Sequence, residues 1–360
     1  MPSPVTKNPV CVTGASGFIA SRIVELLLER GYKVRGTVRS LKKPADTAHL
    51  TSLPGASERL ELVAAELLQD GAFDAAVAGC EYVMHTASPY TLDAKDPQKD
   101  LVDPAVKGTN NVLESCKKAG TVKRVVLTSS MAAITDEPDG EHVLTEADWN
   151  TKSSLQRNPY YFSKTEAERA GWTFCYGVDA PPPEGTPSKV GFDYVAINPF
   201  MVIGPSLSPG LNTSNQMFVD MLGGAYPGIM NLTWGFVDVR DVALAHVLAM
   251  EIPKARGRFV CANVVMTMRA LVEVLTKLGY TDRKLPKMGL DCGIGDYAVR
   301  LSSYMQPKGV GTYLRTHVGR TPNFDHGKLV RDLGFTFRPL EKTIAETLTD
   351  LEKWGHLVAK

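Results

Sequence analysis

The sequence has no excess of charge, no closely spaced pair of cysteines and no long apolar segment. Its 40 basic and 39 acidic residues leave a formal net charge of +1, so no overall field favours nucleic acid or an anionic membrane. The six cysteines include no Cys-x-x-Cys pair or His/Cys cluster, which argues against a metal site and favours a reducing compartment. No run of about 18 apolar residues occurs, and the first residues lack the apolar core of a signal peptide. We therefore expect a cytoplasmic protein with no metal, no nucleic-acid partner and no membrane association.

A strand–turn–helix–strand unit near the start of the chain is the first positive signal. A strand-like segment, residues 10–13, is followed by the turn Gly14-x-x-Gly17-x-x-Ala20, a helical pattern and a second strand-like segment, residues 33–39. Missing side chains in such a turn let the backbone approach a pyrophosphate at the positive end of the helix. The unit therefore predicts a dinucleotide-binding site rather than an ordinary structural turn.

The end of the second strand indicates which dinucleotide is bound. Proteins that prefer NAD place a carboxylate there for the ribose hydroxyls, whereas this chain has Arg39, with Lys42 and Lys43 close behind. A guanidinium forms a planar fork that suits a 2'-phosphate. We predict NADP(H), with the alternative that the three cations form only a solvated surface.

Strand and helix patterns alternate through the first half of the chain. The strand-like segments are residues 10–13, 33–39, 60–64, 82–87, 123–127 and 194–197. This alternation predicts an α/β fold with a doubly wound parallel sheet and right-handed crossovers. We assign residues 1–200 to this Rossmann-type domain. Residues 201–360 are assigned mainly to a smaller, irregular substrate-binding lobe, with about 232–250 returning to the first domain.

Two residues on a predicted helix form the candidate catalytic pair. Tyr160 and Lys164 are four residues apart, so both lie on one helix face about one turn from each other. An ammonium near a phenol favours the phenolate, so the phenol can exchange a proton with a carbonyl oxygen as hydride arrives. Ser130, after the strand at 123–127, offers a hydroxyl to polarise that oxygen. The spacing alone is common, but its position after five strands of a dinucleotide fold strengthens the prediction.

The second half gives weaker signals. An apolar substrate pocket could include Tyr90, Met131, Met201, Met217 and Met221, although plain core packing explains any one of them equally well. The proline-rich residues 178–189 predict a surface loop. Residues 236–243 are expected to form a short strand that leads into a helix capped by Asp241 or Asp238.

These motifs together resemble those of the extended short-chain dehydrogenases/reductases. The resemblance rests on four motifs: Gly14-Ala15-Ser16-Gly17-Phe18-Ile19, Thr128-Ser129-Ser130, Tyr160-x-x-x-Lys164, and Asn198-Pro199-x-x-Val202-x-Gly204-Pro205. More narrowly, residues 35–39, 85–89 and 236–246 are similar to the dihydroflavonol reductase, cinnamoyl-CoA reductase and fungal aldehyde/ketone reductase group. The likeness runs from about residue 10 to residue 357.

The resemblance implies a role for each matching residue. Ser130, Tyr160 and Lys164 correspond to the catalytic triad, and Lys164 also binds the nicotinamide ribose. The implied cofactor contacts are Gly14, Gly17, Phe18 and Ile19 at the pyrophosphate, Arg39 with help from Lys43 at the 2'-phosphate, Glu66 and Leu67 at the adenine, Thr86, Ala87, Ser88 and Thr128 along the cleft, and Pro199 and Val202 beside the nicotinamide.

Three positions depart from the family pattern. Glu66 replaces the usual aspartate at the adenine, Ala20 replaces a third glycine, and Lys107 stands where nucleotide-sugar relatives carry asparagine. The favoured function is NADPH-dependent reduction of an aldehyde or ketone, either small and promiscuous or of a phenylpropanoid type. The alternatives are a nucleotide-sugar epimerase or dehydratase, and a non-catalytic NADP sensor. The sequence leaves open whether the protein is a monomer or a homodimer.

Overall fold

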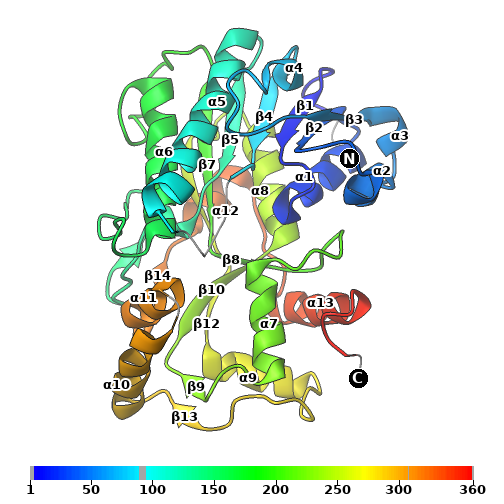
Figure 1. The fold of residues 1–360 in the computed structure, drawn as a ribbon. Coiled ribbons are helices and arrows are strands. Elements are labelled where there is room, and N and C mark those ends of the chain that lie inside the picture. The colour runs from blue at the N-terminus through cyan, green and yellow to red at the C-terminus, as the bar shows by residue number, and fades with distance from the viewer. Residues whose placement is uncertain (1–3, 89–94, 307, 359–360) are drawn as a thin grey trace.

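The main sheet of the protein is parallel and has seven strands. A computed structural model describes residues 4–88, 95–306 and 308–358. The sheet order is β11-β7-β5-β4-β1-β2-β3, and every neighbouring pair is parallel. Its strands are β1 (Val10–Thr13), β2 (Val34–Val38), β3 (Leu60–Ala64), β4 (Tyr82–His85), β5 (Arg124–Thr128), β7 (Asp193–Pro199) and β11 (Gly257–Cys261). The predicted α/β fold with a doubly wound parallel sheet is confirmed (Figure 1).

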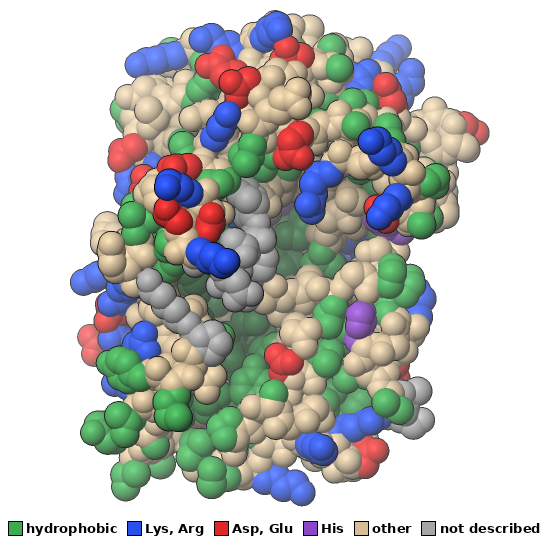
Figure 2. All heavy atoms as spheres, viewed as in Figure 1, with side chains coloured by type: hydrophobic (Ala, Val, Ile, Leu, Met, Phe, Trp, Pro, Cys, Tyr) green, Lys and Arg blue, Asp and Glu red, His purple; other side chains and the backbone are tan. Residues whose placement is uncertain are grey.

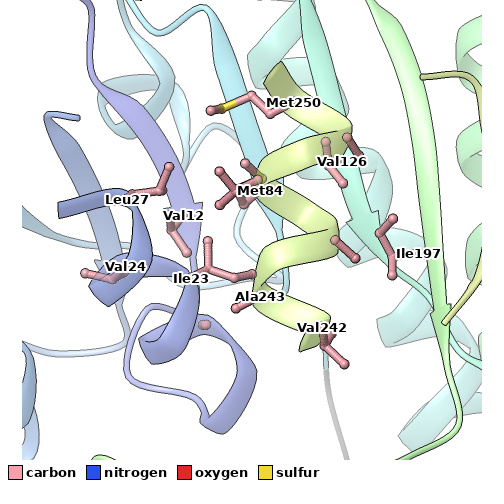
Figure 3. Close-up of a cluster of buried hydrophobic side chains, with 14 of the residues drawn as sticks. Val12, Ile23, Val24, Leu27, Met84, Val126, Ile197, Val242, Ala243 and Met250 are labelled. Atoms are coloured by element: carbon pink, nitrogen blue, oxygen red, sulfur yellow. The ribbon is translucent and has the colours of Figure 1, made fainter. Parts of the chain in front are cut away.

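Helices cover both faces of this sheet. One face carries α1 (Phe18–Glu29), α8 (Val239–Glu251) and α12 (Gly327–Leu333), and the other carries α4 (Asp74–Val77), α5 (Asp103–Ala119) and α6 (Pro159–Tyr176). Figure 3 shows the first of these layers, in which Val12, Met84 and Val126 of the strands meet Ile23 of α1 and Ala243 of α8. Burial of these apolar side chains holds the sheet rigid beneath the ends of its strands.

Short elements connect the strands of the main sheet. They are η1 (Pro44–Thr47), α2 (Ala48–Thr51) and α3 (Ala56–Arg59) between β2 and β3, the π-helical turn η2 (Gln98–Val102) before α5, and the 3-10 turn η3 (Met131–Ala133) after β5. The proline-rich residues 178–189 lie between α6 and β7 and form neither helix nor strand. This loop is fastened to α6, since the amide of Lys189 donates to the carbonyl of Cys175 at 2.8 Å.

The smaller lobe, which lies below the main sheet in Figure 1, has a hydrophobic core of its own. Its strands pair in three groups: β8 (Met201–Ile203) and β12 (Val264–Thr267) on either side of β10 (Thr233–Asp238), β9 (Ile229–Met230) with β13 (Gly289–Leu290), and β6 (Val143–Leu144) with β14 (Asn323–Phe324). Its helices are α7 (Thr213–Gly223), α9 (Met268–Lys277), α10 (Gly293–Ser302), η4 (Ser303–Met305), α11 (Lys308–His317) and α13 (Leu340–Lys353). Apolar side chains of α7, α9 and α13 pack around the three-stranded sheet.

Several segments of the second half return to the main sheet. The sequence analysis assigned only about 232–250 to this return, whereas the structure places α8, β11 and α12 there and β10 in the smaller sheet. Strand β11 pairs with β7 in parallel from Gly257 to Cys261. The sequence of a five-residue segment does not indicate such a long-range pairing. Asp238 caps α8, accepting from the amide of Arg240 at 2.7 Å, while Asp241 accepts from the amide of Arg338 at 2.8 Å.

No helix in the described part of the chain is long and apolar enough to cross a membrane.

Candidate active site

The crevice of the main sheet opens between β1 and β4, where the strand order reverses. The hydroxyl of Thr13, the last residue of β1, accepts hydrogen bonds from the amides of Thr86 at 3.1 Å and Ala87 at 3.0 Å. It also lies 3.0 Å from Nδ1 of His85. One hydroxyl therefore holds the chain that leaves β4 against the end of β1.

The protonation of His85 follows from this arrangement. Burial, with the nearby charge of Lys164, lowers the pKa of His85 to about 3, so the ring is neutral at physiological pH. Because the Thr13 oxygen already accepts from two amides, its own proton must go to Nδ1 of His85. Thr13, which the sequence analysis did not select, is thus an organising residue of the crevice, and no local pattern marks it.

The glycine turn of the predicted pyrophosphate site requires its glycines. Gly14 has φ of +65°, and a Cβ there would lie 3.2 Å from the Cα of Ala87. A Cβ on Gly17 would lie 3.2 Å from the carbonyl oxygen of Gly14. Gly17 is also the N-cap of α1 and has no side chain to occupy the first-turn amides, and the half-buried Phe18 and Ile19 follow it. A backbone cradle at a helix N-terminus fits a phosphate group.

The predicted 2'-phosphate residues lie at the end of β2. Arg39 follows β2 directly, is exposed, and has no hydrogen-bond or ion-pair partner within the described ranges. Lys42 and Lys43 are also exposed, and Lys43 caps η1. Glu66 lies beyond the end of the neighbouring β3 and is exposed. An unpaired guanidinium at this strand end fits a phosphorylated ribose.

Helix α5 supports the segment predicted to contact the adenine. The carbonyl of Leu67 accepts from Nδ2 of Asn111 at 2.9 Å. A Cβ on Gly108 would lie 2.7 Å from Cγ of Leu67, so the glycine allows this close approach. Lys107, one of the departures from the family pattern, pairs with Asp70 at 3.1 Å. Lys107 thus belongs to the support of this segment.

The hydroxyls of Thr128, at the end of β5, and of the following Ser129 and Ser130 have different partners. Ser129 is buried and its hydroxyl donates to Glu168 of α6. Ser130 is half-buried and its hydroxyl accepts from the amide of Ala132 at 3.1 Å, which leaves its proton free to donate. Of the two serines, Ser130 is therefore the one whose hydroxyl proton is not given to another described residue.

Thr128 is held by a buried histidine. Its Oγ1 lies 2.7 Å from Nε2 of His246, whose Nδ1 lies 2.8 Å from the carbonyl oxygen of Val242. Since a carbonyl only accepts, Nδ1 carries the ring proton. Burial lowers the pKa of His246 to about 4, so Nε2 is an acceptor and the Thr128 hydroxyl donates to it.

Helix α6 presents the predicted catalytic pair. The Nζ of Lys164 lies 5.7 Å from the ring centre of Tyr160 and 3.0 Å from Oγ of Ser88. Both Tyr160 and Lys164 are half-buried. Burial lowers the pKa of Lys164 from 10.5 to about 8, so the ammonium is charged at neutral pH but close to its titration point. The pair can therefore support proton transfer near neutrality.

The first residue before α6 is strained. Asn158 has φ of +48° and is the only described residue other than glycine with positive φ. Its Nδ2 donates to Asp136 and, at 3.2 Å, to Oγ1 of Thr316 in α11. Pro159 then begins the helix. These bonds compensate for the strained backbone two residues before Tyr160, and the sequence analysis missed them because the partners are far apart in the chain.

The residues suggested for a substrate pocket do not share one environment. Tyr90 lies outside the described residues. Met131, the first residue of η3, is buried in a small cluster, and Met217 and Met221 are buried in the core of the smaller lobe. Met201, on β8, is half-buried. Pro199 and Val202, predicted beside the nicotinamide, are buried at the end of β7 and on β8.

Two further observations concern the surroundings of the site. Figure 2 shows a hollow between the larger part and the smaller lobe, with hydrophobic side chains inside it. Among residues 4–88, 95–306 and 308–358, no group of three or more His, Cys, Asp or Glu side chains is placed to hold a metal ion.

Comparison with known proteins places this site in a family. The model of the NAD dependent epimerase/dehydratase family matches residues 10–262. The chain is 42% identical over 354 residues to cinnamoyl-CoA reductase CAD2 of Medicago truncatula, covering 96% of each chain. It is 36% identical over 359 residues to tetraketide alpha-pyrone reductase 1 of Arabidopsis thaliana, covering 98% of this chain and 97% of the relative.

A solved structure agrees with these relatives. Yeast methylglyoxal/isovaleraldehyde reductase Gre2, complexed with NADPH, matches with a TM-score of 0.78 and 31% identity, covering 97% of this chain and 100% of that chain. The family match spans most of the sequence and includes the glycine turn, the serine step and the Tyr160/Lys164 pair. The chain belongs to the NAD dependent epimerase/dehydratase family and, within that family, is related to reductases.

Proposed function

We propose that the chain is an NADPH-dependent reductase that converts an aldehyde or ketone to an alcohol, with Tyr160 as the proton donor. The observation that supports it most directly is the position of Lys164. Its Nζ lies 5.7 Å from the ring centre of Tyr160 and 3.0 Å from Ser88, at the mouth of the dinucleotide crevice. The group that tunes the phenol is thus at the edge of the cofactor site.

Each residue of the triad has a separate task in this proposal. NADPH, when bound, supplies the hydride. Tyr160 donates a proton to the carbonyl oxygen, and Ser130 donates a hydrogen bond to the same oxygen and so polarises the carbonyl. The ammonium of Lys164 favours the phenolate that remains after the proton has left. With the cofactor bound, Lys164 would also bind the ribose next to the nicotinamide.

Backbone groups of the glycine turn and charged side chains at the end of β2 would hold the cofactor. Gly14, Gly17, Phe18 and Ile19 would bind the pyrophosphate, since a helix N-terminus and a cradle without side chains meet there. Arg39, with Lys43, would bind the 2'-phosphate, and Glu66 and Leu67 would border the adenine. The remaining contacts would come from Thr86, Ala87, Ser88, Thr128, Pro199 and Val202.

The relatives suggest two classes of substrate. The Medicago truncatula relative is named a cinnamoyl-CoA reductase, and the yeast structure is that of a methylglyoxal/isovaleraldehyde reductase. We propose an aromatic or aliphatic carbonyl compound with an apolar body, bound beside β8 near Met201. The apolar surface inside the hollow supports this choice (Figure 2). Competition between cinnamoyl-type and short aliphatic carbonyls would rank the two classes.

Two other functions are less well supported. An epimerase that retains NAD would be expected to have a carboxylate where this chain has Arg39. A non-catalytic NADP sensor would not need a lysine placed to tune a phenol. All six cysteines are free and five of them are buried, which supports a reducing compartment such as the cytoplasm.

The test is a carbonyl-reduction assay with a matched variant. Purified protein should oxidise NADPH much faster than NADH when an aldehyde panel is offered. Tyr160→Phe should lower kcat by a factor on the order of 100 to 10,000 and leave NADPH binding near normal. The neighbouring Tyr161→Phe is the control and should retain most of the activity. A Tyr160→Phe variant that still turns over would show that the proton comes from elsewhere, and silence across the whole panel would favour the sensor.

A further inference from the structure

A buried ion pair lies directly behind the serine step of the proposed site. Nε of Arg258, on β11, is 2.6 Å from Oε1 of Glu168, on α6, and both side chains are fully buried. Removing two charges from water is costly unless geometry and further hydrogen bonds compensate. The pair therefore calls for an explanation other than stability alone.

Every group around the Glu168 carboxylate is a donor. Oε1 accepts from Nε of Arg258 and, at 3.2 Å, from Nε1 of Trp172. Oε2 accepts from the Ser129 hydroxyl, from Nδ2 of Asn198 at 2.8 Å and from Arg258 at 3.3 Å. Only an ionised carboxylate can accept all of these bonds. Its partners lie on α6, on β7, on β11 and in the segment after β5.

Two of these bonds lead to the serine step. Ser129 is bound through its hydroxyl, and Nδ2 of Asn198 also donates to the carbonyl oxygen of Ser130 at 3.1 Å. Glu168 itself lies one helical turn after Lys164. A single carboxylate thus joins the helix that carries Tyr160 and Lys164 to the segment that carries Ser130.

Arg258 fixes the position of the carboxylate. Its guanidinium donates to the carbonyls of Glu146, Asp148 and Ala133 and stacks on the ring of Trp149 at 3.9 Å. These backbone carbonyls belong to η3 and to the chain between η3 and α6, so the guanidinium also ties that connection to the sheet. The ion pair cannot shift without breaking several bonds at once.

We propose that Glu168 is a positioning residue that sets the distance between the Ser130 hydroxyl and the Tyr160/Lys164 pair. The inference rests on the proposed function, because it assigns Glu168 a role only through those three residues. Near-attack geometry is sensitive to displacements of about 1 Å, which can cost on the order of 100-fold in rate. Loss of the charged acceptor should therefore affect the chemical step more than cofactor binding.

Glu168→Gln is the direct test. The amide keeps the shape of the side chain, but its NH₂ group replaces one carboxylate oxygen. That NH₂ group then faces hydrogen-bond donors, from which it cannot accept. We expect kcat for carbonyl reduction to fall by a factor on the order of 10 to 100, with the dissociation constant of NADPH close to that of the wild type. If kcat is unchanged in a folded variant, or if kcat and NADPH affinity fall together, the proposal is overturned.

Trp172→Phe is the matched control. It removes a donor from the other carboxylate oxygen and leaves Ser129, Asn198 and Arg258 in place. Like Glu168→Gln it disturbs a buried position on α6, so both should lower the melting temperature. Only Glu168→Gln should lower kcat. Equal losses of kcat in the two variants would show that general loss of packing, and not positioning, is responsible.

Ser129→Ala keeps the proposal testable if Glu168→Gln does not fold. It removes one of the connections between the carboxylate and the serine step and should also lower kcat. The double variant should be no slower than Glu168→Gln alone, because both changes break the same connection. Effects that multiply would contradict the proposal. Tyr160→Phe separates the two hypotheses: if that variant stays active, the proposed function fails, whatever Glu168→Gln does.

Discussion

The Nζ of Lys164 donates a hydrogen bond to Oγ of Ser88 at 3.0 Å. Lys164 belongs to α6, and Ser88 belongs to the segment that leaves β4 at the crevice of the sheet. The bond therefore joins the helix of the candidate catalytic pair to the wall of the crevice that we propose holds the cofactor. A change in the charge of Lys164 would therefore alter its contacts with Ser88 on one side of the crevice and with Tyr160 on the other.

The first prediction concerns pH. Burial lowers the pKa of Lys164 from 10.5 to about 8, so the folded protein loses this charge as pH rises through about 8. We expect kcat/KM to fall above that pH by about tenfold for each further unit. Lys164→Arg, which stays charged, should be slower but should lack this fall. An identical alkaline limb in both proteins would assign the titration to another group.

The same shift has a consequence for stability. Between about pH 8 and 10.5 the unfolded chain holds a proton on this amine that the folded protein has lost. More protons are then bound in the unfolded state, so this contribution to the free energy of unfolding rises with pH across that window. Below pH 8 the buried charge opposes folding. Urea unfolding of the wild type and of Lys164→Met at several pH values would reveal the difference.

The second prediction concerns cofactor choice. Arg39→Asp should weaken NADPH binding by about 1.5–3 kcal/mol, roughly ten- to 100-fold, because a charge-assisted bond to the 2'-phosphate is lost. NADH binding should weaken less or improve. Arg331→Asp, at an exposed position on α12, carries the same change of charge and should alter neither affinity. An unchanged preference in Arg39→Asp would assign the phosphate to Lys42 or Lys43.

A third prediction concerns a glycine beneath the phosphate turn. A Cβ on Gly36, in β2, would lie 2.8 Å from Cβ of Ala15 and 3.1 Å from Leu62. Gly36→Ala should therefore push the turn outward, weaken NADPH binding and destabilise the fold by about 1–3 kcal/mol. Gly223→Ala, at the end of α7, meets nothing within 4 Å and should leave both quantities nearly unchanged. Titration calorimetry and thermal unfolding of the two variants would decide.

The fourth prediction concerns the hydroxyl between β1 and β4. Thr13→Val has nearly the same shape but leaves the amides of Thr86 and Ala87 without their acceptor and His85 without its donor. We expect a loss of about 2–4 kcal/mol in the free energy of unfolding, since buried polar groups are left unsatisfied. Thr349→Val, whose hydroxyl bonds within α13 near the surface, should cost little. Similar losses in both would mean that the hydroxyl of Thr13 stabilises the fold no more than a hydroxyl near the surface does.

Much of the larger part was predictable because its signals are local. The glycine turn, the strand periods and the Tyr160/Lys164 spacing each lie within a few residues, and the parallel sheet follows from their order. The choice of Ser130 came from its motif and stays a prediction, and in the structure the neighbouring Ser129 is turned toward Glu168. The NADP(H) expectation rested on one side chain, Arg39, at a strand end.

What could not be predicted depends on partners far apart in the chain. Arg258 meets Glu168 across 90 residues, and Asn158 meets Thr316 across 158, and no periodicity marks either pair. The return of β11 to the main sheet has the same cause. Met217 and Met221, suggested for the pocket, lie in the core of the smaller lobe, because apolar composition alone does not distinguish a lining from a core.

The bond between Asn158 and Thr316 has a practical consequence. Thr316 belongs to α11 of the smaller lobe, next to His317, whose ring lies 5.7 Å from that of Tyr161. If the smaller lobe binds the substrate as we propose, changes to α11 that admit another compound will also disturb the first turn of α6. Libraries that randomise α11 should be screened for turnover and for selectivity together, since a gain in one will often be coupled to a change in the other.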